Sequence, residues 1–276
     1  MSDWTDFLPT AVSAPIKVYQ NQSLITKWWK KLLVHIDKGN TNVIVTGAAG
    51  AGKTVLTMCL HGEVKDHEWE EPQSSKSVEK EAISIGDWTK IFTVIPGQDM
   101  KEREIALNES FNKHQDLDGV IHVVDFGYTT IRSSVAESQM IESGTDSIAA
   151  IRDFNLNKEL EEFKRLSDWI VNANANGRGP NWLVIAVNKA DLYLDDLDDA
   201  KAYYHPDGSG PFKELLDSLM KRVGSNALTV KVVPVCPKPK PFTWGEEKVL
   251  PKLVSFEEPT EYMKNFVSMV AEASSE

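Results

Sequence analysis

The sequence predicts an α/β protein built on a mainly parallel sheet. Short apolar runs typical of buried strands recur along the chain, and segments with the apolar spacing of helices lie between them. Strands that alternate with helices favour a parallel sheet covered by helices on both faces. Two neighbouring runs, residues 82–85 and 90–95, are linked through Gly86 and Asp87, so they predict a hairpin that adds one antiparallel edge strand.

The other elements follow from the same patterns. Apolar runs predict further strands at residues 42–46, 120–124, 182–187 and 228–233. Helical spacing of apolar residues predicts helices at residues 24–36, 53–60, 100–112, 155–173, 212–222 and 260–273. We interpret the acidic run at residues 195–199 as the solvated start of one more helix.

The length of 276 residues favours one large domain with additions over two full domains. We expect an N-terminal extension at residues 1–40, which contains the amphipathic helix, and a main domain at residues 41–276. Two stretches are too long, too polar or too rich in proline for ordinary connections, so we expect insertions near residues 126–153 and 237–254.

Composition and charge exclude several classes of function. Hydrophobic residues make up 41% of the chain, which is enough for a sizeable core, and the net charge of −11 disfavours a nucleic-acid-binding face. Cys59 and Cys236 lack metal-ligand spacing, and we expect both to be reduced. The sequence contains no apolar run long enough for a membrane span and no signal peptide at its start, so we expect a soluble cytoplasmic protein.

The strongest motif is a glycine-rich turn between the strand at residues 42–46 and the helix that follows. Its pattern is G-x-x-x-x-G-K-[ST], the phosphate-binding loop or P-loop. Small residues let main-chain N–H groups turn inward around phosphates, the lysine reaches the outer phosphates, and the threonine hydroxyl binds Mg²⁺. The expected nucleotide-binding residues here are Gly47, Ala48, Ala49, Gly50, Ala51, Gly52, Lys53, Thr54 and Val55.

A second motif follows the strand at residues 182–187. Asn188, Lys189 and Asp191 belong to an N-K-x-D sequence at the carboxyl edge of the sheet, where ligands bind in open α/β folds. A carboxylate there accepts hydrogen bonds from N1–H and the 2-amino group of guanine, donors that adenine lacks. We therefore expect Asp191 to select guanine.

A third motif, Pro-Gly-Gln at residues 96–98, ends the strand at residues 90–95. In phosphoryl-transfer switches the glycine amide at such a turn contacts the γ-phosphate, and the glutamine orients the attacking water. Gly97 and Gln98 are our candidates for these roles, with Lys53 as the second catalytic group. The alternative is a type II turn with an uninvolved polar neighbour.

These three motifs, in this order and each after a predicted strand, resemble those of small GTPases of the translation-factor class, the Ras-like and Arf-like group. The resemblance covers about residues 41–275. It implies a six-stranded P-loop NTPase fold, the G domain, that binds GTP or GDP with Mg²⁺, hydrolyses GTP slowly and acts as a molecular switch. The segment at residues 93–98 looks most similar to the polarity GTPases of gliding bacteria, which hydrolyse GTP without the family's switch II aspartate.

The chain departs from the family pattern at several positions. Val94 stands where the family has that magnesium-linked aspartate, and Ala49 replaces a common glycine. Asp125, after its strand, either substitutes for the missing carboxylate or caps a turn. Residues 62–82 contain no threonine for the first switch, so Ser77 is our candidate metal ligand beside Thr54. Cys236 occupies the loop whose backbone amide meets the guanine carbonyl in the family, or is simply buried at a strand end.

Partners follow from the surface segments. We expect a protein effector or regulator to contact the switch loops and the insertion at residues 126–153. The N-terminal helix, with Trp28 and Trp29 beside two lysines, suits a membrane surface, although packing against the domain is favoured because the chain is acidic. Two other functions stay open: a pseudo-GTPase that binds nucleotide without hydrolysing it, and an ATP-using P-loop protein.

Overall fold

The computed structural model describes residues 41–61, 79–85, 88–94, 117–224, 226–253 and 257–275, together with residues 105, 107, 108 and 111. The expected N-terminal helix lies outside these residues, as do Ser77, Gly97 and Gln98. The two cysteines, the P-loop and the N-K-x-D motif all lie within them.

A six-stranded sheet forms the centre of the fold, in the order β2-β3-β1-β4-β5-β6. Every neighbouring pair is parallel except β2 and β3, which form the predicted antiparallel hairpin. The predicted fold class is therefore confirmed. The strands are β1 (Thr41–Gly47), β2 (Glu79–Ile85), β3 (Trp88–Val94), β4 (Leu117–Val124), β5 (Trp182–Val187) and β6 (Thr229–Pro234).

The burial of the strands explains why the sequence revealed them. All six residues of β5 are buried, as expected for a strand with helices on both faces. β6 closes one edge of the sheet and ends at Pro234, a residue that lacks the N–H needed inside a central strand. The apolar runs thus mark the middle of the sheet, where both faces are covered and polar residues need not alternate with apolar ones.

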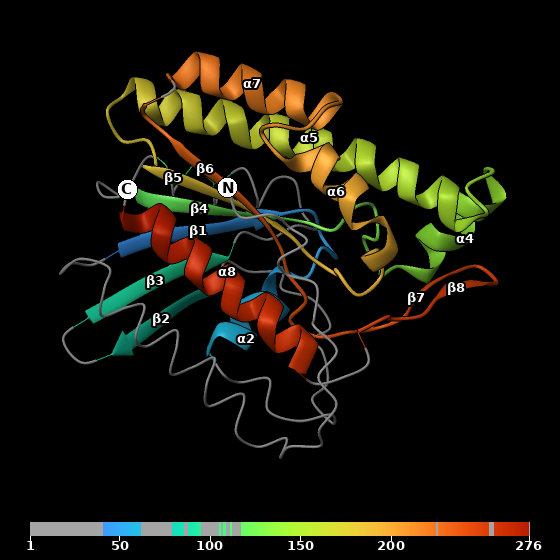
Figure 1. Ribbon diagram of the computed structural model, residues 1–276. Helices are drawn as coiled ribbons and strands as arrows, with labels where there is room; N and C mark the ends of the chain where they lie inside the picture. The colour runs from blue at the N-terminus through green and yellow to red at the C-terminus, as the bar shows by residue number, and fades with distance from the viewer. Residues whose placement is uncertain are drawn as a thin grey trace.

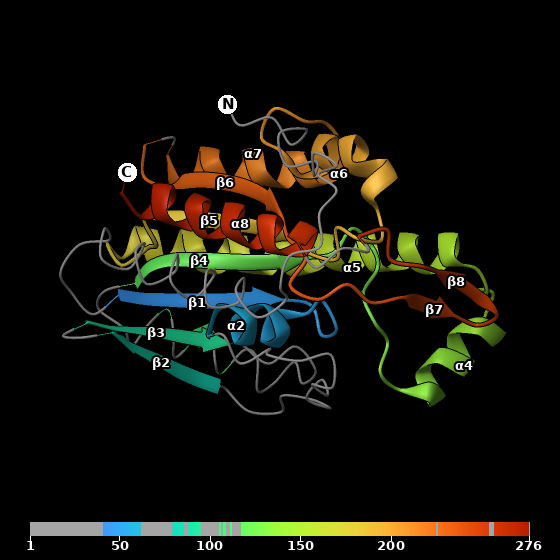
Figure 2. The same ribbon diagram turned by 60° about the horizontal axis from the view of Figure 1, so that its bottom comes forward.

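Helices cover both faces of the sheet (Figure 1). In both ribbon views α5 and α7 lie together on one face, and α2 and α8 lie on the other (Figure 2). None of the helices within the described residues combines the length and apolar character needed to cross a membrane. The bounds are α2 (Lys53–His61), α5 (Ile148–Ala175), α6 (Leu197–Tyr204), α7 (Pro211–Val223) and α8 (Glu257–Ser275).

The expected insertions contain more structure than the sequence indicated. Residues 126–153 include α4 (Ser134–Glu142) and the first turn of α5, whose N-cap Ser147 accepts a hydrogen bond from the Ala150 N–H. Helix α4 buries no residue, so it carries no apolar periodicity to detect. Residues 237–254 include a hairpin of two three-residue strands, β7 (Phe242–Trp244) and β8 (Glu247–Val249), too short for a pattern.

The acidic run begins a helix, as predicted. A 3-10 turn, η2 (Leu194–Asp196), leads into α6, and Asp198 and Asp199 are exposed in the first turn of that helix. Acidic side chains near a helix N-terminus are favoured by the helix dipole. Helix α4 and strands β7 and β8 project beyond the carboxyl ends of the parallel strands, and α6 lies near the same end of the sheet (Figures 1 and 2).

Candidate functional site

The P-loop runs from the end of β1 into α2 and takes a backbone course that requires glycine. Gly50 has φ +87° and Gly52 has φ +94°, values that side-chain-bearing residues rarely adopt. A Cβ on Gly50 would lie 2.2 Å from the carbonyl oxygen of Thr130, and one on Gly52 would lie 2.3 Å from Nδ2 of Asn188. The loop therefore packs against two other segments, one after β4 and one after β5.

Lys53, the first residue of α2, lies across the start of the loop. Its Nζ donates hydrogen bonds to the carbonyl oxygens of Gly47 at 2.8 Å and Ala48 at 2.9 Å, and the residue is only 6% exposed. The ammonium group is thus held beside the main chain of the loop, where the motif requires it for phosphate contact. Thr54 follows it, half-buried at the N-terminus of α2, and Val55 is buried one residue further on.

Asn188 fastens the N-K-x-D motif to the P-loop. Its side-chain Nδ2 donates to the carbonyl oxygen of Ala51 at 2.7 Å, and its own Oδ1 accepts from the Lys189 N–H at 2.8 Å. Asn188 is 3% exposed, and its main-chain N–H continues the sheet by donating to Val124. A buried amide with these partners fixes the distance between the two motifs.

Lys189 joins three segments. Its Nζ donates to the carbonyl oxygens of Gly50 at 2.9 Å and Tyr128 at 2.6 Å, and lies 2.8 Å from Oδ2 of Asp125. The residue has φ +60°, a left-handed conformation that is strained for a residue with a side chain. Such strain persists only where surrounding contacts stabilise it, and the contacts of the ammonium group do so here.

Asp191 is buried beside the loop that follows β6. Its Oδ1 accepts from the Cys236 thiol at 3.3 Å and its Oδ2 from the Lys240 N–H at 3.0 Å. Burial raises the pKa of Asp191, and these two hydrogen bonds partly oppose that shift. Burial and the neighbouring carboxylate also raise the pKa of the Cys236 thiol, which therefore stays protonated and donates. Sequence reasoning placed Cys236 near the base, and the structure brings it to Asp191.

Each carboxylate oxygen of Asp191 carries two lone pairs, and Cys236 and Lys240 use one on each. Asp191 is 1% exposed, so these two donors meet a buried carboxylate.

Asp125 has a role that the sequence left open. Its carboxylate pairs with Lys189 and accepts from the Thr129 hydroxyl at 2.6 Å, and the residue is fully buried. Glu159 of α5 holds the turn after it, because its Oε1 accepts hydrogen bonds from the N–H groups of Asp125 at 3.2 Å and Gly127 at 3.0 Å. Asp125 therefore positions a lysine, and its contacts do not direct it toward Thr54.

Glu159 is a site residue that the sequence did not reveal. It is buried in α5 and accepts a further hydrogen bond at Oε2 from the Tyr204 hydroxyl of α6. Burial first, and then the nearby Asp125 carboxylate, raise the pKa of Glu159 well above its ordinary value. A glutamate on the face of a long helix carries no sequence signal for this role, because only the fold brings it to the turn after β4.

The metal site is described only in part. Thr54 supplies a hydroxyl oxygen, a donor type that Mg²⁺ accepts, while the second expected ligand, Ser77, lies outside the described residues. Among the described residues, no group of three or more His, Cys, Asp or Glu side chains could hold a metal ion. β3 ends at Val94, which pairs with Val45 of β1, so the aspartate-deficient position lies at the carboxyl edge of the sheet.

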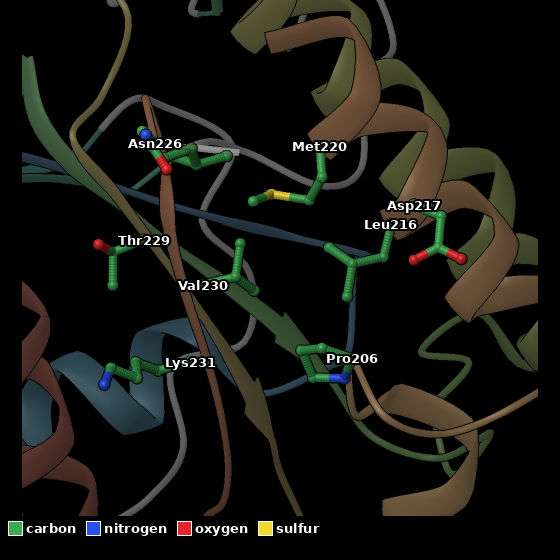
Figure 3. A pocket seen from close by; sticks show the side chains of 9 residues that line it. Pro206, Leu216, Asp217, Met220, Asn226, Thr229, Val230 and Lys231 are labelled. Carbon is green, nitrogen blue, oxygen red and sulfur yellow. The ribbon is translucent and has the colours of Figure 1, made fainter. Parts of the chain in front are cut away.

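A separate cavity of about 510 Å³ lies between α7 and β6 (Figure 3). Leu216 and Met220 of α7 and Val230 of β6 are among its lining residues. None of the residues that line it belongs to the P-loop or to the N-K-x-D motif. It is therefore distinct from the site built by Lys53, Lys189 and their partners.

A comparison with known families agrees with this fold. Residues 42–168 match the family described as 50S ribosome-binding GTPases. The match includes the P-loop and ends before Asn188, so the geometry at Asn188 and Lys189 is independent of it. The match covers less than half of the chain, and together with the strand order it supports the P-loop GTPase fold, known as the G-domain fold. None of the curated proteins compared with the chain matches it.

Solved structures with similar folds are distant in sequence. A dimerization-deficient mutant of Toc33 from Arabidopsis thaliana is 13% identical, with a TM-score of 0.47, over 94% of this chain and 96% of that one. An ADP-ribosylation-factor-like GTP-binding protein, the small COPII coat GTPase SAR1 from Encephalitozoon cuniculi, is 15% identical with a TM-score of 0.39, over 93% and 91%. The narrower resemblance to polarity GTPases finds no support in these comparisons.

Proposed function

We propose that this G-domain protein is a small GTPase that binds GTP with Mg²⁺, hydrolyses it slowly and alternates between GTP and GDP states as a molecular switch. The observation that carries the proposal is the contact between Lys189 Nζ and the Gly50 carbonyl oxygen at 2.9 Å. This contact supports the proposal because it joins the N-K-x-D motif, which would select the base, to the loop that would hold the phosphates.

The chain's own groups have distinct roles in this proposal. The amides of residues 48–54 bind the phosphates, and Lys53 neutralises their charge. Asn188 holds the base-binding loop against the P-loop, and the Asp191 carboxylate binds the base. A magnesium ion, held by Thr54 and Ser77 with the phosphates, would neutralise charge on the transferred group. Gln98 orients the attacking water, and Gly97 contacts the γ-phosphate. Catalysis by positioning alone makes unaided turnover slow.

A pseudo-GTPase is the second candidate, because Val94 occupies the end of β3 where the family carries an aspartate. Such a protein would bind nucleotide on the same residues and leave it intact. Use of ATP is disfavoured, since the Asp191 carboxylate offers acceptors to donors that adenine lacks.

Binding and turnover are measured separately to test the proposal. Purified full-length protein with Mg²⁺ is titrated with fluorescent GDP, GTP and ADP, and phosphate release from GTP is followed under single-turnover conditions. The GTPase proposal expects micromolar or tighter guanine binding, no comparable ADP binding, and slow phosphate release. Guanine binding without phosphate release would favour the pseudo-GTPase, and failure to bind GDP or GTP would refute both.

We further propose that the switch acts on a protein partner through its switch loops and the segment at residues 126–153, in a cytoplasmic setting. The support is the position of that segment, since Thr130 packs against the P-loop glycine Gly50. A partner bound there would sense the phosphate site directly.

A further inference from the structure

A hairpin arm, which we define as residues 240–252, begins and ends on Asp191. The Lys240 N–H donates to Asp191 Oδ2 at 3.0 Å, and the Lys252 N–H donates to the Asp191 carbonyl oxygen at 2.9 Å. Both donors are main-chain groups, so their positions depend on the path of the arm rather than on side-chain rotamers. One end of the arm therefore holds the Asp191 carboxylate, and the other end holds the Asp191 main chain.

The far end of the arm is anchored to the region between α4 and α5. Trp244 Nε1 donates to the Thr145 carbonyl oxygen at 2.8 Å, and Glu247 Oε2 accepts from the Ile148 N–H at 2.7 Å. Ile148 is the first residue of α5, where the helix dipole favours a carboxylate. Trp244 is 2% exposed, whereas Glu247 lies at the surface.

The arm also contacts the segment that holds Lys189. Phe242 packs edge-on against Tyr128 with ring centroids 5.4 Å apart, and the Tyr128 carbonyl oxygen accepts from Lys189 Nζ. Both charged groups of the N-K-x-D motif are thus linked to the arm, Asp191 through hydrogen bonds and Lys189 through Tyr128.

A hairpin of this size cannot hold its own position. Its ladder comprises only three residue pairs, Phe242 with Val249, Thr243 with Lys248 and Trp244 with Glu247. Isolated two-stranded hairpins are marginally stable at best. The anchors at Trp244 and Glu247, together with the Phe242 contact, therefore help to determine where Lys240 lies and, through it, how the Asp191 carboxylate is aimed.

We propose that the arm is a positioning element for base discrimination, and that Trp244 and Glu247 act through Lys240 on Asp191. This inference rests on the proposed guanine-binding function. The anchors touch no nucleotide-binding residue, and they set how the Asp191 carboxylate is aimed at the two N–H donors of guanine. Loosening the arm weakens the recognition of the 2-amino group first, because that bond requires the carboxylate to be held in plane with the base.

The test compares GDP with inosine diphosphate, which lacks only the 2-amino group. In full-length protein, Glu247→Ala removes the anchor at α5 without opening the core. We expect the ratio of GDP to inosine diphosphate affinity to fall about three- to tenfold, the worth of one hydrogen bond, and GDP to dissociate faster. Trp244→Phe removes the second anchor and should act in the same direction.

Two controls separate positioning from general loosening. Glu247→Gln keeps an oxygen that accepts from Ile148, so it should restore most of the wild-type ratio. Glu272→Ala removes another exposed carboxylate, one that pairs with Lys231 at 2.9 Å on the opposite face, and should leave the ratio unchanged.

An unchanged ratio in Glu247→Ala and Trp244→Phe would overturn the inference, as would equal weakening of both nucleotides, which indicates a merely structural role. Wild-type protein that fails to bind GDP at all would instead refute the proposed function.

Discussion

Lys189 Nζ lies 2.9 Å from the carbonyl oxygen of Gly50, which joins two loops separated by 139 residues of sequence. The same ammonium group pairs with the buried carboxylate of Asp125 at 2.8 Å. One cation therefore holds the P-loop, the loop after β5 and the turn after β4 in a single arrangement.

Replacing this cation should destabilise the fold as well as the site. In Lys189→Met the Asp125 carboxylate, fully buried, loses its partner, and we expect a loss of about 3–5 kcal/mol in the free energy of unfolding. Lys213→Met is the matched control, since Lys213 pairs with the exposed Asp217 within α7 and should cost about 0–1 kcal/mol. Urea unfolding of both variants checks this, and equal losses would contradict the role given to Lys189.

The P-loop glycines should be intolerant of even one methyl group. Gly50→Ala places a Cβ 2.2 Å from the Thr130 carbonyl oxygen, and we expect loss of GDP binding. Gly144→Ala shares the positive φ but has no atom within 4 Å of the added Cβ, so only backbone strain of about 1–2 kcal/mol remains. Isothermal titration with GDP distinguishes them, and unimpaired binding in Gly50→Ala would show that the loop does not pack as described.

The base preference should change with Asp191. In Asp191→Asn the amide offers a donor where the carboxylate offers an acceptor, so guanine binding weakens by about 1.5–3 kcal/mol and xanthine nucleotides gain. Competition of GTP and XTP for the variant measures this. Retained selection of GTP over XTP would remove Asp191 from base recognition.

Stability should depend on pH through Glu159. Its pKa is raised above the ordinary value of 4.5 by burial and by Asp125, so the folded state keeps a proton that the unfolded state releases. As the pH rises from about 4.5 through the raised pKa, the free energy of unfolding should therefore fall.

Glu159→Gln removes this titration while its amide oxygen still accepts from the N–H groups of Asp125 and Gly127. The difference in stability between wild type and variant, measured by urea unfolding at pH 5 and pH 8, should shift in favour of the variant at the higher pH. A pH-independent difference would mean that Glu159 titrates normally.

Turnover should depend on Gln98, which lies outside the described residues. Gln98→Leu should bind GTP and GDP as the wild type does and release phosphate more slowly, because the water loses its orienting partner. Single-turnover phosphate release together with GDP titration separates the two effects. Unchanged turnover would exclude Gln98 from the mechanism.

The sequence alone determined the strands, most helices and the motifs of the site. Apolar runs such as β5 are buried along their whole length, and the glycines of the P-loop motif match the positive φ angles at Gly50 and Gly52. These features depend on neighbours in sequence, so periodicity and residue type are enough to reveal them. The sequence did not predict the hairpin β7–β8 or α4, because three-residue strands and a helix without buried residues show no periodic spacing of apolar residues.

Only the tertiary structure decided how the motifs cooperate. The bonds of Lys189 to Gly50 and Asp125, of Glu159 to the turn after β4 and of Lys240 to Asp191 connect residues that are far apart in the chain. No local pattern encodes such pairs, because each forms only when the fold brings distant strands, helices and loops together at one edge of the sheet. The residue types indicated the chemistry of the site, and the packing of the sheet and its helices determined which groups meet there.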